Sequence, residues 1–150
     1  MRLAIQRVSE ASVSVDDGVI GRIDKGLVVL VGFVEGDEEN DVNALAEKLS
    51  KLRIMSDKEG KMNLNIKDSK GSYLVVSQFT LSADTSKGNR PSFIKAANPK
   101  VAERLYGDFI TKLKELDVDV KTGKFGAYMT IDLKLDGPVT ILLDSKSKKV

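Results

Sequence analysis

Three strand patterns joined by tight turns fill the first 34 residues, and this order constrains the fold more than any other feature of the sequence. Apolar and polar residues alternate over residues 2–15, as in a half-buried strand. The turn sequences Asp16-Asp17-Gly18 and Asp24-Lys25-Gly26 enclose a second strand at 19–23. The run 27–34 is apolar on both faces, which predicts a central strand. Strands that follow one another as hairpins favour an antiparallel sheet.

Two later segments have the spacing of amphipathic helices. Apolar residues recur every three or four positions over 42–52, and Asp41 is the expected N-cap of this helix. The second helix is expected to begin with Asn98 as its N-cap and Pro99 in its first turn. Its expected buried face consists of Val101, Ala102, Leu105, Phe109, Leu113 and Leu116.

Strand patterns return between and after the helices, at residues 73–79, 118–122, 127–133 and 139–143. We therefore expect about seven strands and two helices in one domain covering 1–150, because roughly 100–200 residues make one domain. The predicted class is α+β (mixed α/β), with an antiparallel-rich sheet curled toward a barrel and two main helices packed outside. A doubly wound parallel sheet is the alternative.

The composition excludes several kinds of chemistry. The chain has no His and no Cys, so it has no disulfide, thiolate nucleophile, Ser-His-Asp triad or imidazole metal site. Proton transfer in an enzyme of this composition would use carboxylate, Lys, Tyr, the backbone or the substrate. A hard cation such as Mg²⁺ on oxygen ligands remains the open metal option.

The sequence also indicates a compartment. Its longest apolar run, 27–31, is far shorter than the ~20 residues of a membrane span, so no membrane contact is expected. The first seven residues contain no apolar signal-peptide core. We expect a cytoplasmic protein.

Two polar segments beside strands are candidates for chemistry. Ser77-Gln78-Phe79-Thr80 closes the strand predicted at 73–79, where free backbone N–H groups could bind an anion or oxyanion. An ordinary half-exposed strand is the alternative. The segment 87–93 contains Lys87 and Arg90, which suit phosphate contacts, although a solvated turn would also contain them.

A third candidate lies in the last strands. It comprises 125–129 and 136–140, and the latter contains Gly-Pro after an acid. Asp132 and Asp136 could form a carboxylate pair or bind Mg²⁺, but acids at strand ends are more often surface charges.

Five collinear segments together resemble the D-aminoacyl-tRNA deacylase family, from residue 1 to about 145. They are 1–8, 77–81, 87–93, 123–129 and 136–140. Members of that family hydrolyse the ester between a D-amino acid and the 3′-terminal ribose of tRNA, and also remove glycine mischarged on tRNA-Ala. They are homodimers with active sites at the subunit interface. The resemblance implies an aminoacylated tRNA 3′ end as partner, no DNA, no cofactor and no metal.

The resemblance also implies roles for residues of the pocket. Ser77, Gln78, Phe79 and Thr80 would line it, with the Phe79 and Thr80 backbone amides at the scissile carbonyl. Phe125 and Met129 would shape the pocket wall and the adenine site.

The same resemblance implies a chirality filter. Gly137-Pro138 would be the family's cis Gly-Pro motif, which enters the partner's active site, holds the α-amino group through backbone carbonyls and excludes L side chains. Arg7 would hold that motif in orientation. Leu135 stands where the family usually has Asn, and Ser82 replaces a bulkier residue.

Two rival functions remain at this point. A non-catalytic nucleic-acid-binding protein is favoured by the basic stretch 85–100 and the Lys-rich tail 146–150, but a net charge of +2 is low for such a protein. An ATP- or metal-dependent enzyme lacks support, because the sequence contains no P-loop and no cluster of acids.

Overall fold

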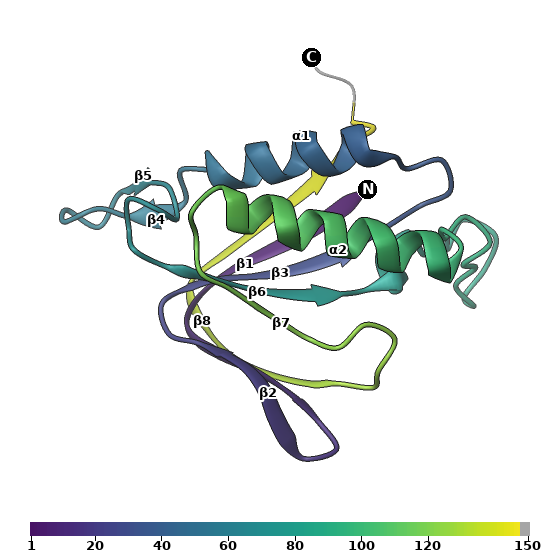
Figure 1. The fold of residues 1–150 in the computed structure, drawn as a ribbon, viewed down its shortest axis with the longest axis horizontal. Helices are drawn as coiled ribbons and strands as arrows, with labels where there is room; N and C mark the ends of the chain where they lie inside the picture. The colour runs from purple at the N-terminus through teal and green to yellow at the C-terminus, as the bar shows by residue number, and fades with distance from the viewer. Residues whose placement is uncertain (148–150) are drawn as a thin grey trace.

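A computed structural model describes residues 1–147, in which a mixed sheet is covered on one face by two helices lying side by side (Figure 1). The elements in chain order are β1 (Arg2–Val15), β2 (Gly18–Ile23), β3 (Gly26–Gly32), α1 (Glu39–Ser50), β4 (Met55–Ser56), β5 (Met62–Leu64), β6 (Ser72–Ser77), the 3₁₀ helix η1 (Phe79–Ser82), α2 (Pro99–Glu115), β7 (Val120–Thr122) and β8 (Thr130–Asp144). No helix within these residues is long and apolar enough to cross a membrane.

The long strand β1 organises the sheet. It pairs antiparallel with β2, β3 and β8, whereas β3–β6 and β6–β7 are parallel. The parallel pairs follow from α1 and α2, which each carry the chain back across the sheet before the next strand. The sheet order is β2-β1-β3-β6-β7 with β8 on β1, and the sheet is nearly barrel-shaped. The predicted class, with its antiparallel-rich curled sheet and two outer helices, is confirmed.

Two apolar cores explain why the central strands are hydrophobic on both faces. In β3, Leu27, Val29 and Val31 face the helices and join the larger core. Val28 points the other way, into a smaller core that includes Leu74 of β6 and lies inside the curl of the sheet. The prediction of a buried central strand is confirmed.

Of the two predicted N-caps, one is wrong and one is confirmed. The N-cap of α1 is Glu38, and Asp41 is instead the third residue of the helix, where its carboxylate accepts a 2.9 Å hydrogen bond from the Glu38 N–H. This reciprocal capping box is why an acid at position 41 resembles an N-cap in the sequence. Asn98 does cap α2, with its side chain accepting from Lys100 N at 3.0 Å, and Pro99 follows it.

The buried face of α2 differs from the prediction at its first turn. Val101 is 40% exposed, whereas Ala102 is only partly buried against the core and full burial of the helix face begins at Leu105. Tyr106, which the apolar stripe did not include, is buried and donates its hydroxyl hydrogen to the Val75 carbonyl at 2.9 Å.

The strand boundaries were partly wrong. The segments 127–133 and 139–143 are one strand, β8, which runs through Asp136-Gly137-Pro138 with irregular register opposite Gln6–Glu10 of β1. Such irregularities let a Pro lie within a paired strand. The Gly137–Pro138 peptide bond is cis. The described residues contain eight strands against the expected seven or so, and the short strand β5 lies in 61–70, a stretch whose sequence favours a loop with a short strand.

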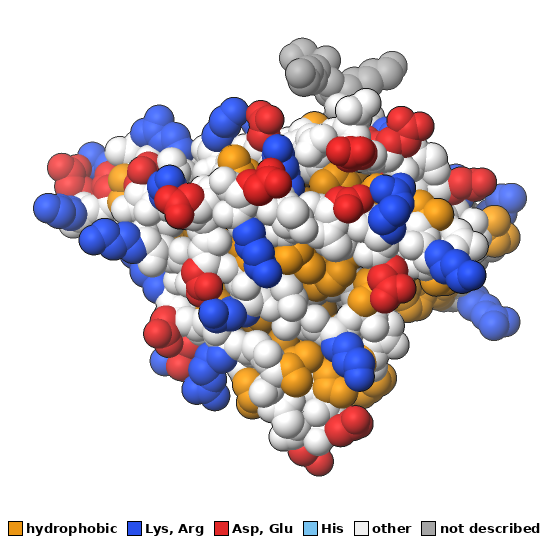
Figure 2. Space-filling model, in the orientation of Figure 1, with side chains coloured by type: hydrophobic (Ala, Val, Ile, Leu, Met, Phe, Trp, Pro, Cys, Tyr) orange, Lys and Arg blue, Asp and Glu red, His pale blue; other side chains and the backbone are white. Residues whose placement is uncertain are grey.

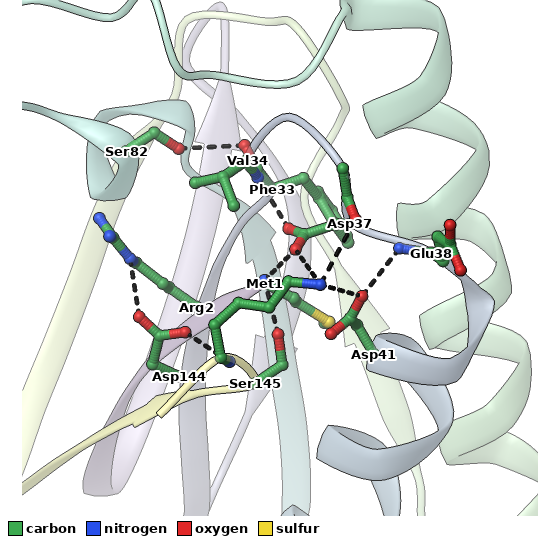
Figure 3. A network of polar contacts seen from close by, with 12 residues as sticks. Met1, Arg2, Phe33, Val34, Asp37, Glu38, Asp41, Ser82, Asp144 and Ser145 are labelled. Atoms are coloured by element: carbon green, nitrogen blue, oxygen red, sulfur yellow. Dashed lines mark hydrogen bonds and ion pairs between the residues drawn. The ribbon is translucent and has the colours of Figure 1, made fainter. Parts of the chain in front are cut away.

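A polar network joins the first residue to the end of β8 (Figure 3). The Met1 ammonium lies 2.6 Å from Asp37 Oδ1, with both groups fully buried, and donates to Ser145 Oγ at 2.8 Å. Arg2 Nε pairs with Asp144 Oδ2 at 3.1 Å. Lys146, the start of the Lys-rich tail, binds Asp41, and the rest of the tail from 148 lies outside the described residues.

Candidate active site

A cavity of about 730 Å³ opens beyond the ends of β3 and β6. It is mainly apolar, and Figure 2 shows hydrophobic side chains exposed between α2 and the lower end of the sheet. Five of the residues predicted for the site line this one cavity: Ser77, Gln78, Phe79, Phe125 and Met129.

Three parts of the chain meet at this cavity for topological reasons. Because β3 and β6 are parallel, with Val31 beside Ser77 in the last pair, both strands end at the same edge of the sheet. Ligands commonly bind at the carboxyl ends of such strands. The first turn of α2 and the connection between β7 and β8, which carries Phe125 and Met129, close the other sides.

The strand predicted to extend to Phe79 ends at Ser77, and the chain then turns into η1. Gln78 N donates to the Val31 carbonyl at 2.7 Å and fixes the start of the turn. Within the described part of the chain, the Phe79 and Thr80 amides have no hydrogen-bond acceptor, as expected for the first turn of a helix. Gln78 Nε2 donates to Thr80 Oγ1, which leaves the Thr80 hydroxyl hydrogen free to donate.

Two side chains anchor η1 to the rest of the fold, and Figure 3 shows the second of them, Ser82. Arg2 Nη1 donates to the Leu81 carbonyl at 2.8 Å, and Ser82 Oγ donates to the Phe33 carbonyl at 3.0 Å. Ser82 is buried, and its hydroxyl is satisfied by this bond. Both anchors hold the turn that presents the Phe79 and Thr80 amides.

Aromatic rings form the rim of the cavity. Phe79 is 61% exposed and meets Phe93 edge to face, with ring centroids 5.0 Å apart. Phe125 packs against Tyr106 at 5.8 Å, and Tyr128 is almost fully exposed. The sequence interpretation gave Phe93 and Tyr128 no role. Phe93 could have been noticed as an aromatic residue that directly follows a polar loop.

The buried tyrosines are poor candidates for a general base. Burial raises the pKa of Tyr106 and the pKa of Tyr73 well above their usual range. Both phenols therefore stay protonated at neutral pH.

Other predicted site residues lie away from this cavity. Arg7, Gly137 and Pro138 belong to the middle of β1 and β8, and none of them lines it. Lys87 and Arg90 lie in an exposed loop and do not line it either. Thr80, predicted to line the pocket, follows Phe79 in η1 but is exposed and is not part of the cavity lining.

Arg7 and the Gly-Pro segment form a second cluster. Arg7 is buried, and its Nη1 donates to the Ile54 carbonyl at 2.8 Å. Its Nε donates to the Asp136 carbonyl at 3.1 Å and lies 3.1 Å from Asp136 Oδ2. Gly137 has φ +128°, and a Cβ there would lie 3.2 Å from Arg7 Nη2, so both conformation and space favour glycine.

The comparison with known proteins decides the family. The model of the D-Tyr-tRNA(Tyr) deacylase family matches residues 4–144. This chain belongs to that deacylase family, a family of hydrolases. The predicted resemblance is confirmed.

Relatives of the deacylase family match along nearly the whole chain. The D-aminoacyl-tRNA deacylase of Flavobacterium psychrophilum is 51% identical over 150 residues, which is 99% of this chain and 100% of the relative. That of Dehalococcoides mccartyi is 53% identical over 148 residues, which is 99% of this chain and 97% of the relative.

Two solved structures have the same fold. One, titled "c-Myc DNA Unwinding Element Binding Protein", has a TM-score of 0.92 and 37% identity, covering 98% of this chain and 100% of its own. The other, titled "Structural Analysis of a probable eukaryotic D-amino acid tRNA deacylase", has a TM-score of 0.80, 18% identity and coverages of 95% and 97%. At that identity it shows the deacylase-family fold alone.

The acids considered for a metal do not gather in this deacylase-family fold. Asp136 binds Arg7, whereas Asp132 is exposed near the start of β8, where it pairs with Ser12 of β1. No group of three acidic side chains with metal-ligand geometry occurs within residues 1–147.

Proposed function

We propose that this chain hydrolyses the ester bond of D-aminoacyl-tRNA, and of glycine mischarged on tRNA-Ala, releasing the free amino acid and tRNA in the cytoplasm. One observation carries the proposal: the Phe79 and Thr80 amides are without an acceptor among the described residues, at an aromatic-rimmed cavity of a deacylase-family chain. Two adjacent N–H groups can stabilise the oxyanion that forms when water attacks an ester carbonyl.

The base in this reaction comes from the substrate. Water adds to the carbonyl carbon, the bond from that carbon to the 3′ oxygen breaks, and the 3′ oxygen takes up a proton. The chain has no His or Cys, its buried tyrosines stay protonated, and no carboxylate or Lys is among the residues that line the cavity, so the neighbouring ribose 2′-OH is the group that activates water. A tRNA ending in 2′-deoxyadenosine should be hydrolysed at least 100-fold more slowly. An undiminished rate would contradict this step.

Thr80 assists through its hydroxyl. Its oxygen accepts from Gln78, so its hydrogen is directed to another acceptor, such as the oxyanion or the attacking water. Replacing Thr80 with Ala should lower kcat by about tenfold, whereas Thr80→Ser should keep most of it. Full activity of Thr80→Ala would exclude its hydroxyl from the reaction.

The tRNA end binds along the aromatic rim. Phe79, Phe93 and Tyr128 offer exposed rings on which a base can stack, while Phe125 and Met129 enclose the adenine. Lys87 and Arg90 lie in an exposed loop without an ion pair in the described chain, so they are available to phosphates.

Chirality is read by a second subunit. Gly137 and Pro138 are exposed and do not line the cavity of their own subunit, so a role at a pocket requires another copy. In the proposed homodimer, the backbone carbonyls of this pair hold the α-amino group and block the position of an L side chain, while Arg7 orients the pair. Because the side chain of the amino acid is not read, many D-amino acids and glycine are accepted.

A DNA-binding function is the second candidate, since one 37% identical structure is titled as a DNA unwinding element binding protein. A net charge of +2 argues against strong DNA binding. Competition settles the choice: excess duplex or single-stranded DNA should not inhibit hydrolysis of D-tyrosyl-tRNA at physiological salt. Stoichiometric binding of DNA by a chain that hydrolyses no D-tyrosyl-tRNA would favour the DNA-binding function.

The location of the site is tested by filling the cavity. Ala127 lines it, so Ala127→Trp should reduce hydrolysis of D-tyrosyl-tRNA at least 100-fold. Val19→Trp, at an exposed position of β2, is the matched control and should leave the rate unchanged. Equal activity of both variants would show that the reaction occurs elsewhere.

A further inference from the structure

Besides the basic stretch 85–100 beside the cavity, a second segment carries an excess of positive charge: residues 48–70, which we call the basic segment. It contains seven Lys and Arg against three Asp and Glu. The remainder of the chain has seventeen Lys and Arg against nineteen Asp and Glu, so without the basic segment it would be net negative. The neutral-looking net charge of +2 therefore conceals a local cationic surface.

Several cations of the basic segment are free to bind a polyanion. Lys48, Lys58 and Lys70 are exposed, and within residues 1–147 none of them is in an ion pair. Lys51 and Lys61 pair only with exposed acids, in contacts that water screens strongly. Figure 2 shows Lys and Arg side chains projecting from the end of the molecule that holds β4 and β5.

This surface is at the wrong end of the subunit to serve its own cavity. The cavity lies beyond the ends of β3 and β6, whereas the β4–β5 hairpin lies at the opposite end of the sheet (Figure 1). No residue of the basic segment lines the cavity of its own subunit.

The basic segment is instead joined to the Gly-Pro pair. One buried guanidinium, that of Arg7, donates both to the carbonyl of Ile54, within the segment, and to the carbonyl of Asp136, next to Gly137. Wherever Gly137-Pro138 is placed in a dimer, the basic segment is held nearby through Arg7.

We infer that the basic segment of one subunit binds the phosphate backbone of the tRNA whose 3′ end occupies the partner subunit's cavity. This rests on the proposed function, in which Gly137-Pro138 enters that cavity. Because the basic segment is joined to Gly137-Pro138, it lies near the partner's pocket. There it contacts the acceptor stem of the tRNA where the stem emerges from that pocket. Each active site then uses the cavity and the Phe79 and Thr80 amides of one subunit. The other subunit supplies Gly137-Pro138 as the chirality filter and the basic segment as a clamp on the RNA.

The first test removes charge without changing the pocket. Lys58→Gln/Lys70→Gln should raise KM for D-tyrosyl-tRNA about tenfold and lower the slope of log KM against log salt by about two. Hydrolysis of D-tyrosyl-adenosine, which has no phosphates, should be unchanged. Arg22→Gln/Arg104→Gln removes two exposed charges elsewhere and should change neither.

The outcomes separate the two proposals. An unchanged KM and salt slope in an active enzyme would overturn the clamp, and so would an equal loss on both substrates. A wild-type chain that hydrolyses neither substrate would instead overturn the proposed function, and the inference with it.

The second test asks which pocket the segment serves. In a mixed dimer, Ala127→Trp closes one pocket, and Lys58→Gln/Lys70→Gln is placed either on the same subunit or on the other. KM should rise about tenfold only when all three changes are on one subunit, because the open pocket then faces the neutralised segment. A rise only in the opposite arrangement, or an equal effect in both, would contradict service across the interface.

Discussion

Arg7 binds Asp136 twice, through a 3.1 Å hydrogen bond from Nε to the carbonyl oxygen and a 3.1 Å ion pair to Oδ2. The guanidinium comes from β1 and is buried, while Asp136 lies in β8 just before Gly137. A third bond, to the Ile54 carbonyl, leaves the side chain little freedom. Arg7 therefore fixes the backbone from which the proposed chirality filter projects.

Replacing Arg7 should loosen that filter. Arg7→Gln should lower the ratio of D- to L-tyrosyl-tRNA hydrolysis at least tenfold, and should destabilise the fold by about 3 kcal/mol because buried partners lose a charged donor. Rates on both substrates and urea unfolding measure the two effects. Arg22→Gln, at an exposed position, should change neither. An unchanged D-to-L ratio in folded Arg7→Gln would remove Arg7 from the specificity mechanism.

Phe79 should matter for activity far more than for folding. Its ring is 61% exposed and contacts Phe93, so Phe79→Ala should cost under about 1 kcal/mol in urea unfolding. The loss of a stacking surface should lower kcat/KM for D-tyrosyl-tRNA about 10–100-fold. Met62→Ala, at a 59% exposed residue of β5, should lower neither quantity appreciably. Equal kcat/KM for both variants would remove the ring from the site.

Gly32 couples the fold to the active-site turn. A Cβ at this residue would lie 2.8 Å from the Gln78 carbonyl oxygen and 2.8 Å from Leu81 Cβ, so Gly32→Ala should push η1 out of place. We expect about 1–3 kcal/mol of destabilisation and a larger fractional loss of kcat than of binding. Gly107→Ala in α2 meets open space and should stabilise by about 0.5–1 kcal/mol with normal kcat. Normal kcat in Gly32→Ala would contradict this coupling.

Asp41 should make stability depend on acid pH. Partial burial acts to raise the pKa of Asp41, but the Glu38 N–H, Ser145 and Lys146 outweigh it and hold that pKa below its ordinary value. Its contribution is therefore complete above about pH 4 and is lost as pH falls through the folded-state pKa. Asp41→Asn should cost about 0.5–1 kcal/mol at pH 7, because the carboxylate is partly solvated.

Urea unfolding of both forms at pH 7 and pH 3 measures this. The gap between wild type and Asp41→Asn in the free energy of unfolding should narrow at the lower pH. A gap of equal size at both pH values would show that charge at this position contributes nothing.

Much of the architecture could be predicted from local pattern. The alternation in 2–15, the doubly apolar run of β3 and the cap of Asn98 and Pro99 all depend on near neighbours in sequence, and the structure confirms them. Asp41 was misplaced because an acid in the third helical position and an N-cap acid look alike without coordinates. The two last strand patterns were separated because Gly137-Pro138 normally interrupts a strand, and only pairing with β1 shows that β8 continues.

The site was predictable only in part. Ser77 to Phe79, Phe125 and Met129 do line one cavity, although nearly fifty residues separate the two groups. The contact of Phe93 with Phe79 and the burial of Arg7 against Ile54 and Asp136 depend on tertiary packing, so no local pattern could reveal them. The placement of the basic segment at the other end of the sheet from the cavity also depends on tertiary packing, so the sequence could not reveal it.

The most direct measurement of the central claim is release of tyrosine from matched D- and L-tyrosyl-tRNA by the unmodified chain, in the presence of EDTA. We predict rapid release from the D ester and release from the L ester no faster than in buffer alone. The account would be contradicted if tyrosine were released from neither ester or from both at equal rates. It would also be contradicted if the D ester were hydrolysed only after Mg²⁺ is restored.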